Sequence, residues 1–314
     1  MTHHYDNRTI RTRIEKRRKK RIFFVILSLT LLGLGFAFTW WIFSQHQTST
    51  SQPQTDKQTQ TVKDSSSTKP KQEDISNSTI TWVKQTEPVK IPILMYHAIH
   101  VMDPSEAPNA NLIVAPDIFE SHLAALKEAG YYSLNPAEAY KVLTENVLPK
   151  DKKVVWLTFD DSLRDFYTNA FPLLEQYQMK ATNNVITSFV ENGREDMLTL
   201  NQIAEMKDKG MSFEDHTVNH PDLAVSSPDT QESELKISKD YLDQNLNQQT
   251  TTVAYPSGRY TETTMSIAEK LGYKMGLTTN NGLASLSDGL LSLNRVRIMP
   301  TTTAEDLLQE IATP

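Results

Sequence analysis

The chain has 314 residues, no cysteine and a formal net charge of −6. The negative balance argues against nucleic acid as a partner, and the lack of cysteine excludes thiolate metal sites and cysteine nucleophiles. A chain of this length has room for one or two domains, whose cores must hold without disulfides.

The first 43 residues predict a membrane anchor. Residues 1–21 form a basic tail, in which residues 8–21 hold nine Lys or Arg and one Glu. Residues 22–43 carry no charge, and as a helix at about 1.5 Å per residue they would span roughly 33 Å. A cleaved signal peptide is the alternative, but its apolar core is usually shorter and no A-x-A-like site follows. We expect an uncleaved transmembrane helix, with the tail in the cytoplasm and everything after Phe43 outside the cell.

Residues 44–88 predict a disordered stalk. They are rich in Ser, Thr, Gln and Lys, with almost no large apolar residues and no glycine. Such a composition cannot bury enough apolar surface to fold. We expect the folded domain to occupy residues 89–314.

From residue 89 onward, short apolar runs alternate with amphipathic stretches. The runs predict strands at residues 91–97, 154–160, 181–187, 211–215, 251–257, 273–279 and 293–299. The amphipathic stretches predict helices at residues 116–130, 164–179, 200–210, 228–246, 261–272 and 303–311, with Pro172 a complication inside the second. Strands that alternate with helices favour a largely parallel α/β sheet, either a barrel of β/α units or an open sheet.

Polar side chains follow four of these predicted strands at the point where each strand ends. Both parallel architectures place their chemistry at such carboxyl ends. The side chains concerned are His97, Asp160 and Asp161, Asp215 and His216, and Ser257 with Gly258.

A metal site is one interpretation of these side chains. His216 and His220 lie four residues apart and share a face in a helix or a strand, so both can reach one ion. H-x-x-x-H alone is a weak pattern, and Thr217 stands where a zinc protease has its general base. One of Asp160 and Asp161 could cap the next helix, but two adjacent carboxylates repel each other unless a cation or a proton intervenes. Two imidazoles and one carboxylate make a common catalytic zinc set.

Several segments resemble the polysaccharide deacetylases (NodB-homology domain, family 4 carbohydrate esterases). Residues 157–161 (LTFDD) are similar to the first motif of that family, residues 216–223 (HTVNHPDL) to the second, and residues 253–260 (VAYPSGRY) to one form of the third. Residues 93–99 (ILMYHAI) resemble the branch that includes poly-N-acetylglucosamine deacetylases. The resemblance covers about residues 91–311 and implies a distorted (β/α) barrel.

The resemblance also implies roles for the residues of these motifs. It makes Asp161, His216 and His220 the ligands of one divalent metal ion, for which zinc fits best and cobalt, nickel or iron also suit the set. It makes Asp160 the general base, and a backbone N–H near Ser257 would help to hold the oxyanion.

The sequence departs from the family pattern at two positions, the arginine that orients the base and the histidine that acts as the general acid. Ala254 stands where the family often has an arginine that orients the base, and no histidine follows His220, although the family takes its general acid from late in the chain. We expect His97 to be the acid. Among the unassigned histidines of the domain it alone ends a strand, since His100 lies in a loop and His122 on the polar side of a predicted helix.

The anchor and the stalk would place this chemistry on the outer face of a cell membrane. The expected substrate is an acetylated glycan of the envelope, peptidoglycan or poly-N-acetylglucosamine, from which N-acetyl groups are removed. An O-acetyl carbohydrate esterase and a catalytically impaired carbohydrate-binding surface protein are the alternatives.

Overall fold

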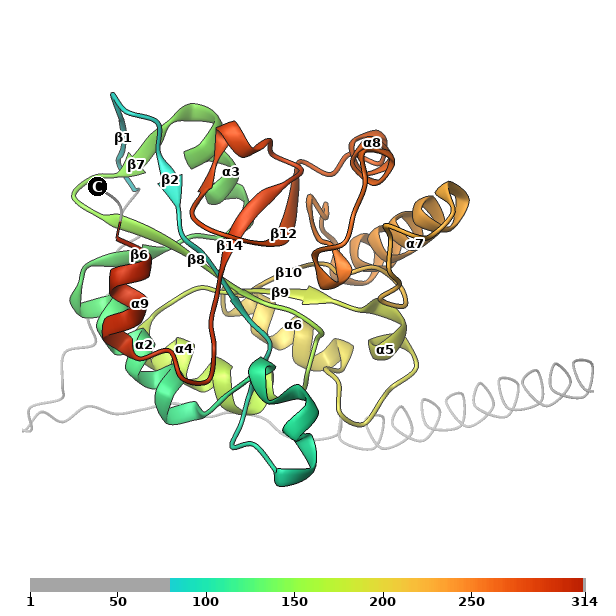
Figure 1. Ribbon diagram of the computed structural model, residues 1–314, viewed down its shortest axis with the longest axis horizontal. Helices are drawn as coiled ribbons and strands as arrows, with labels where there is room; N and C mark the ends of the chain where they lie inside the picture. The colour runs from blue at the N-terminus through green and yellow to red at the C-terminus, as the bar shows by residue number, and fades with distance from the viewer. Residues whose placement is uncertain (1–79, 313–314) are drawn as a thin grey trace, which may run out of the picture. The chain divides into compact units, whose positions relative to one another are not determined.

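Seven parallel strands form a closed ring within residues 80–312, the residues that the computed structural model describes (Figure 1). The order around the ring is β3, β14, β12, β11, β10, β9 and β8, and the pairing of β8 with β3 closes it. This ring agrees with the expected (β/α) barrel rather than with an open sheet. The strands are β3 (Ile93–Tyr96), β8 (Lys153–Phe159), β9 (Thr182–Val185), β10 (Ser212–Asp215), β11 (Thr252–Ala254), β12 (Met275–Asn281) and β14 (Leu293–Arg297).

Helices in the connections between strands pack against the outside of the ring (Figure 1). They are α2 (Pro116–Glu128), α4 (Phe171–Tyr177), α5 (Thr187–Glu191), α6 (Leu200–Asp208), α7 (Pro228–Leu246), α8 (Glu262–Lys270) and α9 (Ala304–Glu310). Helix α3 (Pro136–Glu145) packs instead on the cluster that contains Trp156 and Leu277. The sequence had not predicted α3 and α5. The signal for α3 was a capping box, in which the Asn135 side chain accepts the N–H of Glu138 and the Glu138 side chain accepts the N–H of Asn135.

The helix predicted at residues 164–179 is divided at its proline. A π-helical turn, η2 (Phe166–Ala170), leads into α4, and Pro172 lies in the first turn of α4. Proline has no N–H and its ring conflicts with the carbonyl one turn earlier. The wider turn of η2 precedes the proline, so that α4 can begin as a new helix there.

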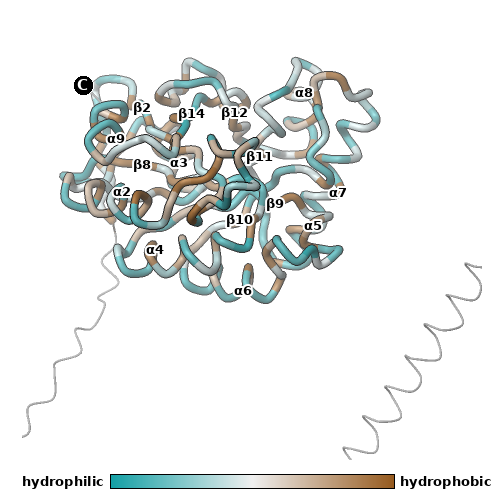
Figure 2. The backbone as a smooth tube through the Cα atoms, turned by 60° about the horizontal axis from the view of Figure 1, so that its bottom comes forward, coloured by the Kyte–Doolittle hydropathy of each residue, from teal (hydrophilic) through white to brown (hydrophobic). Residues whose placement is uncertain are grey.

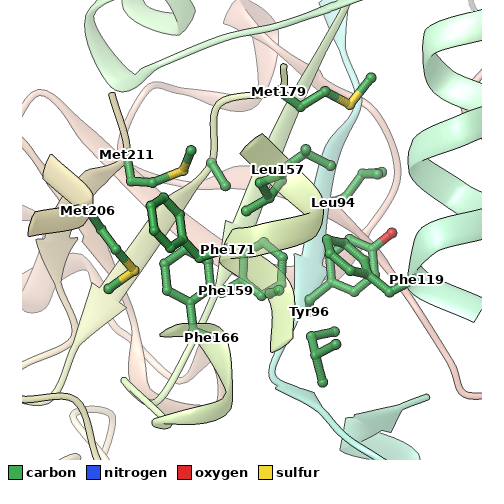
Figure 3. Packing of buried hydrophobic residues seen from close by; sticks show 14 of the residues in the cluster. Leu94, Tyr96, Phe119, Leu157, Phe159, Phe166, Phe171, Met179, Met206 and Met211 are labelled. Atoms are coloured by element: carbon green, nitrogen blue, oxygen red, sulfur yellow. The ribbon is translucent and has the colours of Figure 1, made fainter. Parts of the chain in front are cut away.

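The side chains of β8 alternate between the helical shell and the interior of the ring. Val155, Leu157 and Phe159 belong to the large core cluster between strands and helices (Figure 3). The Phe159 ring stacks on Tyr96 with centroids 5.1 Å apart and meets Phe166 at 4.8 Å. Because neighbouring residues of a strand face opposite ways, the outward packing of Phe159 turns the side chain of Asp160 toward the interior of the ring. Apolar stretches lie on the barrel strands and recur along the helices that pack on them (Figure 2).

Short strands and turns complete the described part of the chain. They are β1 (Trp82–Lys84), β2 (Lys90–Ile91), β4 (Ala98–Ile99), β5 (Ile113–Val114), β6 (Tyr131–Ser133), β7 (Val147–Pro149) and β13 (Ala284–Ser285), with η1 (Pro104–Leu112), η3 (Pro256–Gly258) and η4 (Leu286–Asp288).

The end of the predicted stalk is wrong, because the fold begins before residue 89. Strand β1 pairs antiparallel with β7. The Asn146 side chain donates to the carbonyls of Gln85 and Glu87 and accepts the N–H of Val89. Strand β1 has only three residues, and its partner β7 lies more than 60 positions along the chain, so no local pattern indicates it. The polar composition around β1 therefore predicted a disordered segment.

The predicted tail at residues 1–21, the predicted membrane helix at residues 22–43 and most of the predicted stalk lie outside the described residues. Within residues 80–312, no helix has the length and apolar character that crossing a membrane requires.

Candidate active site and metal centre

Asp160 follows β8 and turns into the barrel, where it is 3% exposed. Its carboxylate is held by a guanidinium that the sequence had not singled out. Arg295, fully buried on β14, donates from Nη1 to Oδ1 at 3.0 Å and from Nη2 to Oδ2 at 2.7 Å. Its Nε donates to the Thr278 carbonyl at 2.7 Å, which fixes the plane of the fork. Such a two-point contact orients a carboxylate as well as neutralising it.

Arg295 makes the contact with Asp160 that an arginine at position 254 would have been expected to make from the family pattern. Ala254 lies on β11, and Arg295 reaches Asp160, the expected base, from β14. The signal in the sequence was an arginine at an inward position of the apolar run 293–299. A charged residue inside a buried strand needs a partner, so Arg295 could have been suspected.

Asn184 on β9 is a second residue that the sequence did not single out. Its Nδ2 donates to Asp160 Oδ1 at 2.7 Å, and both residues are buried. Burial would raise the pKa of Asp160, but the Arg295 guanidinium, with His216 and His97, holds it well below the ordinary range. Asp160 is therefore ionised, and its direction is fixed by side chains from β9 and β14, two strands that do not pair with each other.

Asp161 points to a different set of partners. Its Oδ1 lies 3.4 Å from His216 Nε2 and 3.7 Å from His220 Nε2. The two imidazole rings meet edge to face with centroids 4.8 Å apart. No Lys or Arg of residues 80–312 forms an ion pair with Asp161. The three side chains expected to bind a metal thus lie together.

The donor set of this cluster fits a divalent cation. One ligand atom from each of Asp161, His216 and His220 lies within 4.8 Å of the others. The Nδ1 of His216 lies 2.6 Å from the Ala254 carbonyl, which can only accept, so Nδ1 carries a proton and Nε2 is the nitrogen that faces Asp161 and could bind a cation. Two imidazole nitrogens and one carboxylate oxygen are typical of catalytic zinc sites that leave a position open.

The backbone around this cluster adopts an unusual conformation. Positive φ values occur at Asp161 (76°), Ser162 (55°), Thr217 (69°), His220 (57°) and Ser257 (53°). Residues other than glycine rarely adopt this region, and strained backbone tends to concentrate at functional sites. Three predicted site residues are among the five.

His97, between β3 and β4, faces the same space. Its Nε2 lies 4.0 Å from Asp160 Oδ2, and its side chain is 14% exposed. Burial lowers the pKa of His97, while Asp160 and Asp161 act in the opposite direction. The geometry brings the expected acid beside the expected base.

The other two histidines have different surroundings. His100 lies between Asp165 and Glu106, with its Nδ1 2.7 Å from Asp165 Oδ2. His122 was expected on the polar side of its helix, and that is wrong. It is fully buried between the Tyr96 hydroxyl and the Thr302 carbonyl. The helical pattern could not reveal these two polar partners, which come from other segments.

Ser257 lies in the turn η3 after β11, the strand next to β10. The Gly258 N–H donates to the Tyr255 carbonyl at 2.8 Å and closes the turn. A Cβ at Gly258 would overlap Thr279, so this turn requires glycine. The turn presents the Ser257 backbone at the carboxyl-terminal end of the barrel.

Comparison with known proteins identifies the family. The family model described as "Polysaccharide deacetylase" matches residues 148–276. YxkH of Bacillus subtilis, which carries the name of a polysaccharide deacetylase, is 42% identical over 224 residues, or 71% of this chain and 77% of that protein. The chain belongs to the polysaccharide deacetylase family. As a member of this family it is a hydrolase.

Two further proteins are similar to this polysaccharide deacetylase. The solved Streptococcus pyogenes deacetylase PplD, in complex with acetate, is 60% identical with a TM-score of 0.70, over 72% of this chain and all of that one. A poly-beta-1,6-N-acetyl-D-glucosamine N-deacetylase of Staphylococcus aureus is 32% identical over 182 residues, which cover 54% of this chain and 61% of that protein.

Proposed function

We propose that this polysaccharide deacetylase is a metal-dependent N-deacetylase of N-acetylglucosamine residues in a cell-envelope glycan. The observation that carries the proposal is that two adjacent carboxylates at the end of β8 have different partners. Asp160 is locked to a guanidinium, and Asp161 faces two imidazoles. The name of the Staphylococcus aureus relative supports an amide substrate.

In this proposal Asp161, His216 and His220 hold one divalent cation. Zinc suits the donor set, and cobalt, nickel or iron also bind such sets. When bound, the cation would polarise the acetamido carbonyl and acidify a water molecule.

Asp160 acts as the general base. It accepts the proton of the attacking water, and its ionised state at neutral pH makes it ready to do so. Arg295 and Asn184 keep the carboxylate from rotating. The hydrogen bonds from Arg295 and Asn184 also lower the proton affinity of Asp160. The site thus has a well-oriented base that is a weaker base than a free carboxylate.

His97 acts as the general acid. An amine leaves badly unless its nitrogen is protonated, and the His97 imidazole lies within 4.0 Å of the base. The water oxygen bonds to the carbonyl carbon as Asp160 takes its proton, and the C–N bond breaks as His97 protonates the nitrogen. The products are the amine and acetic acid, which ionises to acetate, and transfer of the proton from Asp160 to His97 restores both residues. A backbone N–H near Ser257 would stabilise the negative charge that develops on the carbonyl oxygen.

The proposed location follows from residues 1–43. The basic tail and the uncharged segment after it support a single-pass anchor with the barrel outside the cell. An envelope glycan, peptidoglycan or poly-N-acetylglucosamine, is then the acetylated polymer within reach. The cell membrane is the second partner in this proposal.

Metal analysis combined with an acetate-release assay tests the proposed function. The full-length protein in detergent should retain one equivalent of divalent metal and release acetate from N-acetylated chito-oligosaccharides. Release from acetylated xylan alone would make the protein an O-acetyl esterase. A metal-free protein that binds the oligosaccharide without releasing acetate would make it a carbohydrate-binding protein.

A further inference from the structure

The segment that carries both expected metal-binding imidazoles, residues 216–220, is held in a conformation that its sequence does not favour. Thr217 has φ 69° and His220 has φ 57°. For a β-branched residue such as Thr217, the left-handed region is a true outlier. Surrounding contacts must therefore impose this conformation.

Asp215 supplies the contact at the start of this segment. It is fully buried on the outer side of β10, opposite to His216. Its Oδ1 accepts the backbone N–H of Thr217 at 2.9 Å and the Ser238 hydroxyl at 2.5 Å, and its Oδ2 accepts the Tyr273 hydroxyl at 2.5 Å. Ser238 comes from α7 and Tyr273 from the turn before β12, so the carboxylate is anchored from two elements.

Thr217 passes this restraint on to His220. Its Oγ1 accepts the backbone N–H of His220 at 3.0 Å, and its carbonyl accepts the N–H of Thr187 on α5 at 3.1 Å. The backbone of Thr217 is thus held on both sides, and the backbone of His220 is tied to it. The position of His220 relative to His216 depends on the φ angle of Thr217, which the Asp215 contact on its N–H and the Thr187 contact on its carbonyl fix together.

We propose that Asp215 is a positioning residue for the metal centre, which sets the separation of the two imidazoles without touching the ion. This inference rests on the metal site proposed above. Asp215 does not belong to the cluster of possible ligands, and its carboxylate is occupied by three donors. Removal of the carboxylate should release Thr217 toward ordinary φ values and spread the ligand set.

The surroundings of Asp215 indicate a conservative replacement. The Tyr273 hydroxyl also lies 2.8 Å from the Leu235 carbonyl, and the Ser238 hydroxyl lies 3.4 Å from it. In Asp215→Asn, the amide oxygen can still accept the Thr217 N–H. The amide nitrogen can donate to Tyr273, whose own proton then goes to Leu235. Asparagine therefore preserves the restraint on Thr217, whereas alanine removes it.

Zinc affinity of the full-length protein in detergent, measured by competition with a chromophoric chelator, tests this inference. Asp215→Ala should raise the Kd for zinc by roughly 10–100-fold, the usual effect of losing a group that orients metal ligands. Asp215→Asn should remain within a few-fold of the unaltered protein. Excess zinc should restore the turnover of Asp215→Ala with an unchanged KM for the glycan, which a merely structural role would not produce.

Asp243→Ala is the matched control. Asp243 lies on α7, the helix that carries Ser238, and like Asp215 it accepts a backbone N–H, from Thr250 at 2.6 Å. Its side chain forms no hydrogen bond or ion pair with residues 216–220. Its loss should lower stability without changing zinc affinity. Unaltered zinc affinity in folded Asp215→Ala would overturn the role of Asp215 alone, whereas an unaltered protein without zinc affinity would overturn the metal site itself.

Tyr273→Phe covers the case in which Asp215→Ala does not fold. It removes one of the two side-chain donors that anchor the Asp215 carboxylate and leaves the Thr217 contact in place. A smaller rise of the zinc Kd supports the inference, and an affinity equal to that of the unaltered protein overturns it.

Discussion

Asp160 and Asp161 are neighbours in the sequence, yet they belong to two unlike halves of the site. The half around Asp160 is complete within the protein, because a guanidinium and an amide occupy its carboxylate. Among the described residues, the Asp161 carboxylate has only the two imidazoles as ion-pair partners. The backbone of this half has positive φ values at Asp161, His220 and Ser257. This difference supports the proposal that the protein itself neutralises Asp160, the proposed base, whereas Asp161 is available to bind a cation.

The largest effect should come from the Asp161 half. Asp161→Ala should abolish metal binding and acetate release together, since it removes one of three ligands. The fold should survive, because no Lys or Arg of the described chain depends on this carboxylate. Metal content and activity are measured side by side. Asp222→Ala, which removes an exposed carboxylate beyond His220, is the control and should keep both. If the Asp161→Ala variant still binds metal, Asp161 is not a required ligand and the distinction between the two halves of the site is wrong.

Arg295→Met should show that the Asp160 half depends on protein partners. It removes the guanidinium from a buried ion pair and leaves the Asp160 charge unpaired, which typically costs about 3–5 kcal/mol of unfolding free energy. Urea unfolding of residues 80–314 measures this. Arg259→Met is the matched control, because its ion pair with Asp222 is exposed and such pairs contribute about 0–1 kcal/mol. Equal losses in the two variants would contradict the distinction between the halves.

His97→Ala separates proton transfer from metal binding. A lost general acid should lower turnover by about 10²–10⁴-fold while metal content remains intact. Turnover and bound metal are measured on the same sample. His100→Ala serves as the control, because His100 faces Asp165 and Glu106 instead of the base. Near-full turnover in metal-replete His97→Ala would remove His97 from the mechanism.

Asn184→Ala should have the smallest effect of the four. It removes one hydrogen bond to the Asp160 carboxylate, and bonds to charged groups contribute about 1.5–3 kcal/mol. The expected loss of unfolding free energy is thus smaller than for Arg295→Met. Asn183→Ala is the control, because the Asn183 side chain forms no hydrogen bond in the described part of the chain. An effect as large as that of Arg295→Met would mean that the amide is the main partner of the base.

The sequence predicted those parts of the site that lie in short, continuous motifs. The spacing of His216 and His220 and the carboxylates after β8 could be found because a strand end and its turn are local. Arg295 and Asn184 could not be assigned in the same way, because their contacts with Asp160 join residues that are 135 and 24 positions apart. Pairing across a barrel is decided by the order of its strands, which local periodicity does not contain.

The same limit explains the errors in the fold. The alternation of apolar and amphipathic segments was sufficient to predict a parallel β/α arrangement. It did not reveal β1, whose partner is β7, or the burial of His122 between Tyr96 and Thr302. In each case the missing information was a partner distant in the chain, and no feature of the segment itself indicated it.

The closure of the ring has a consequence for the order in which the enzyme becomes competent. Strand β14 pairs with β3, so the last barrel strand docks on the first, and Arg295 arrives with it. A nascent chain that ends before residue 295 can already contain Asp160, Asp161 and both imidazoles, but its base has no guanidinium. Long-range pairings of this kind form late in folding. We therefore expect activity to appear only when nearly the whole domain has been synthesised and β14 has docked on β3.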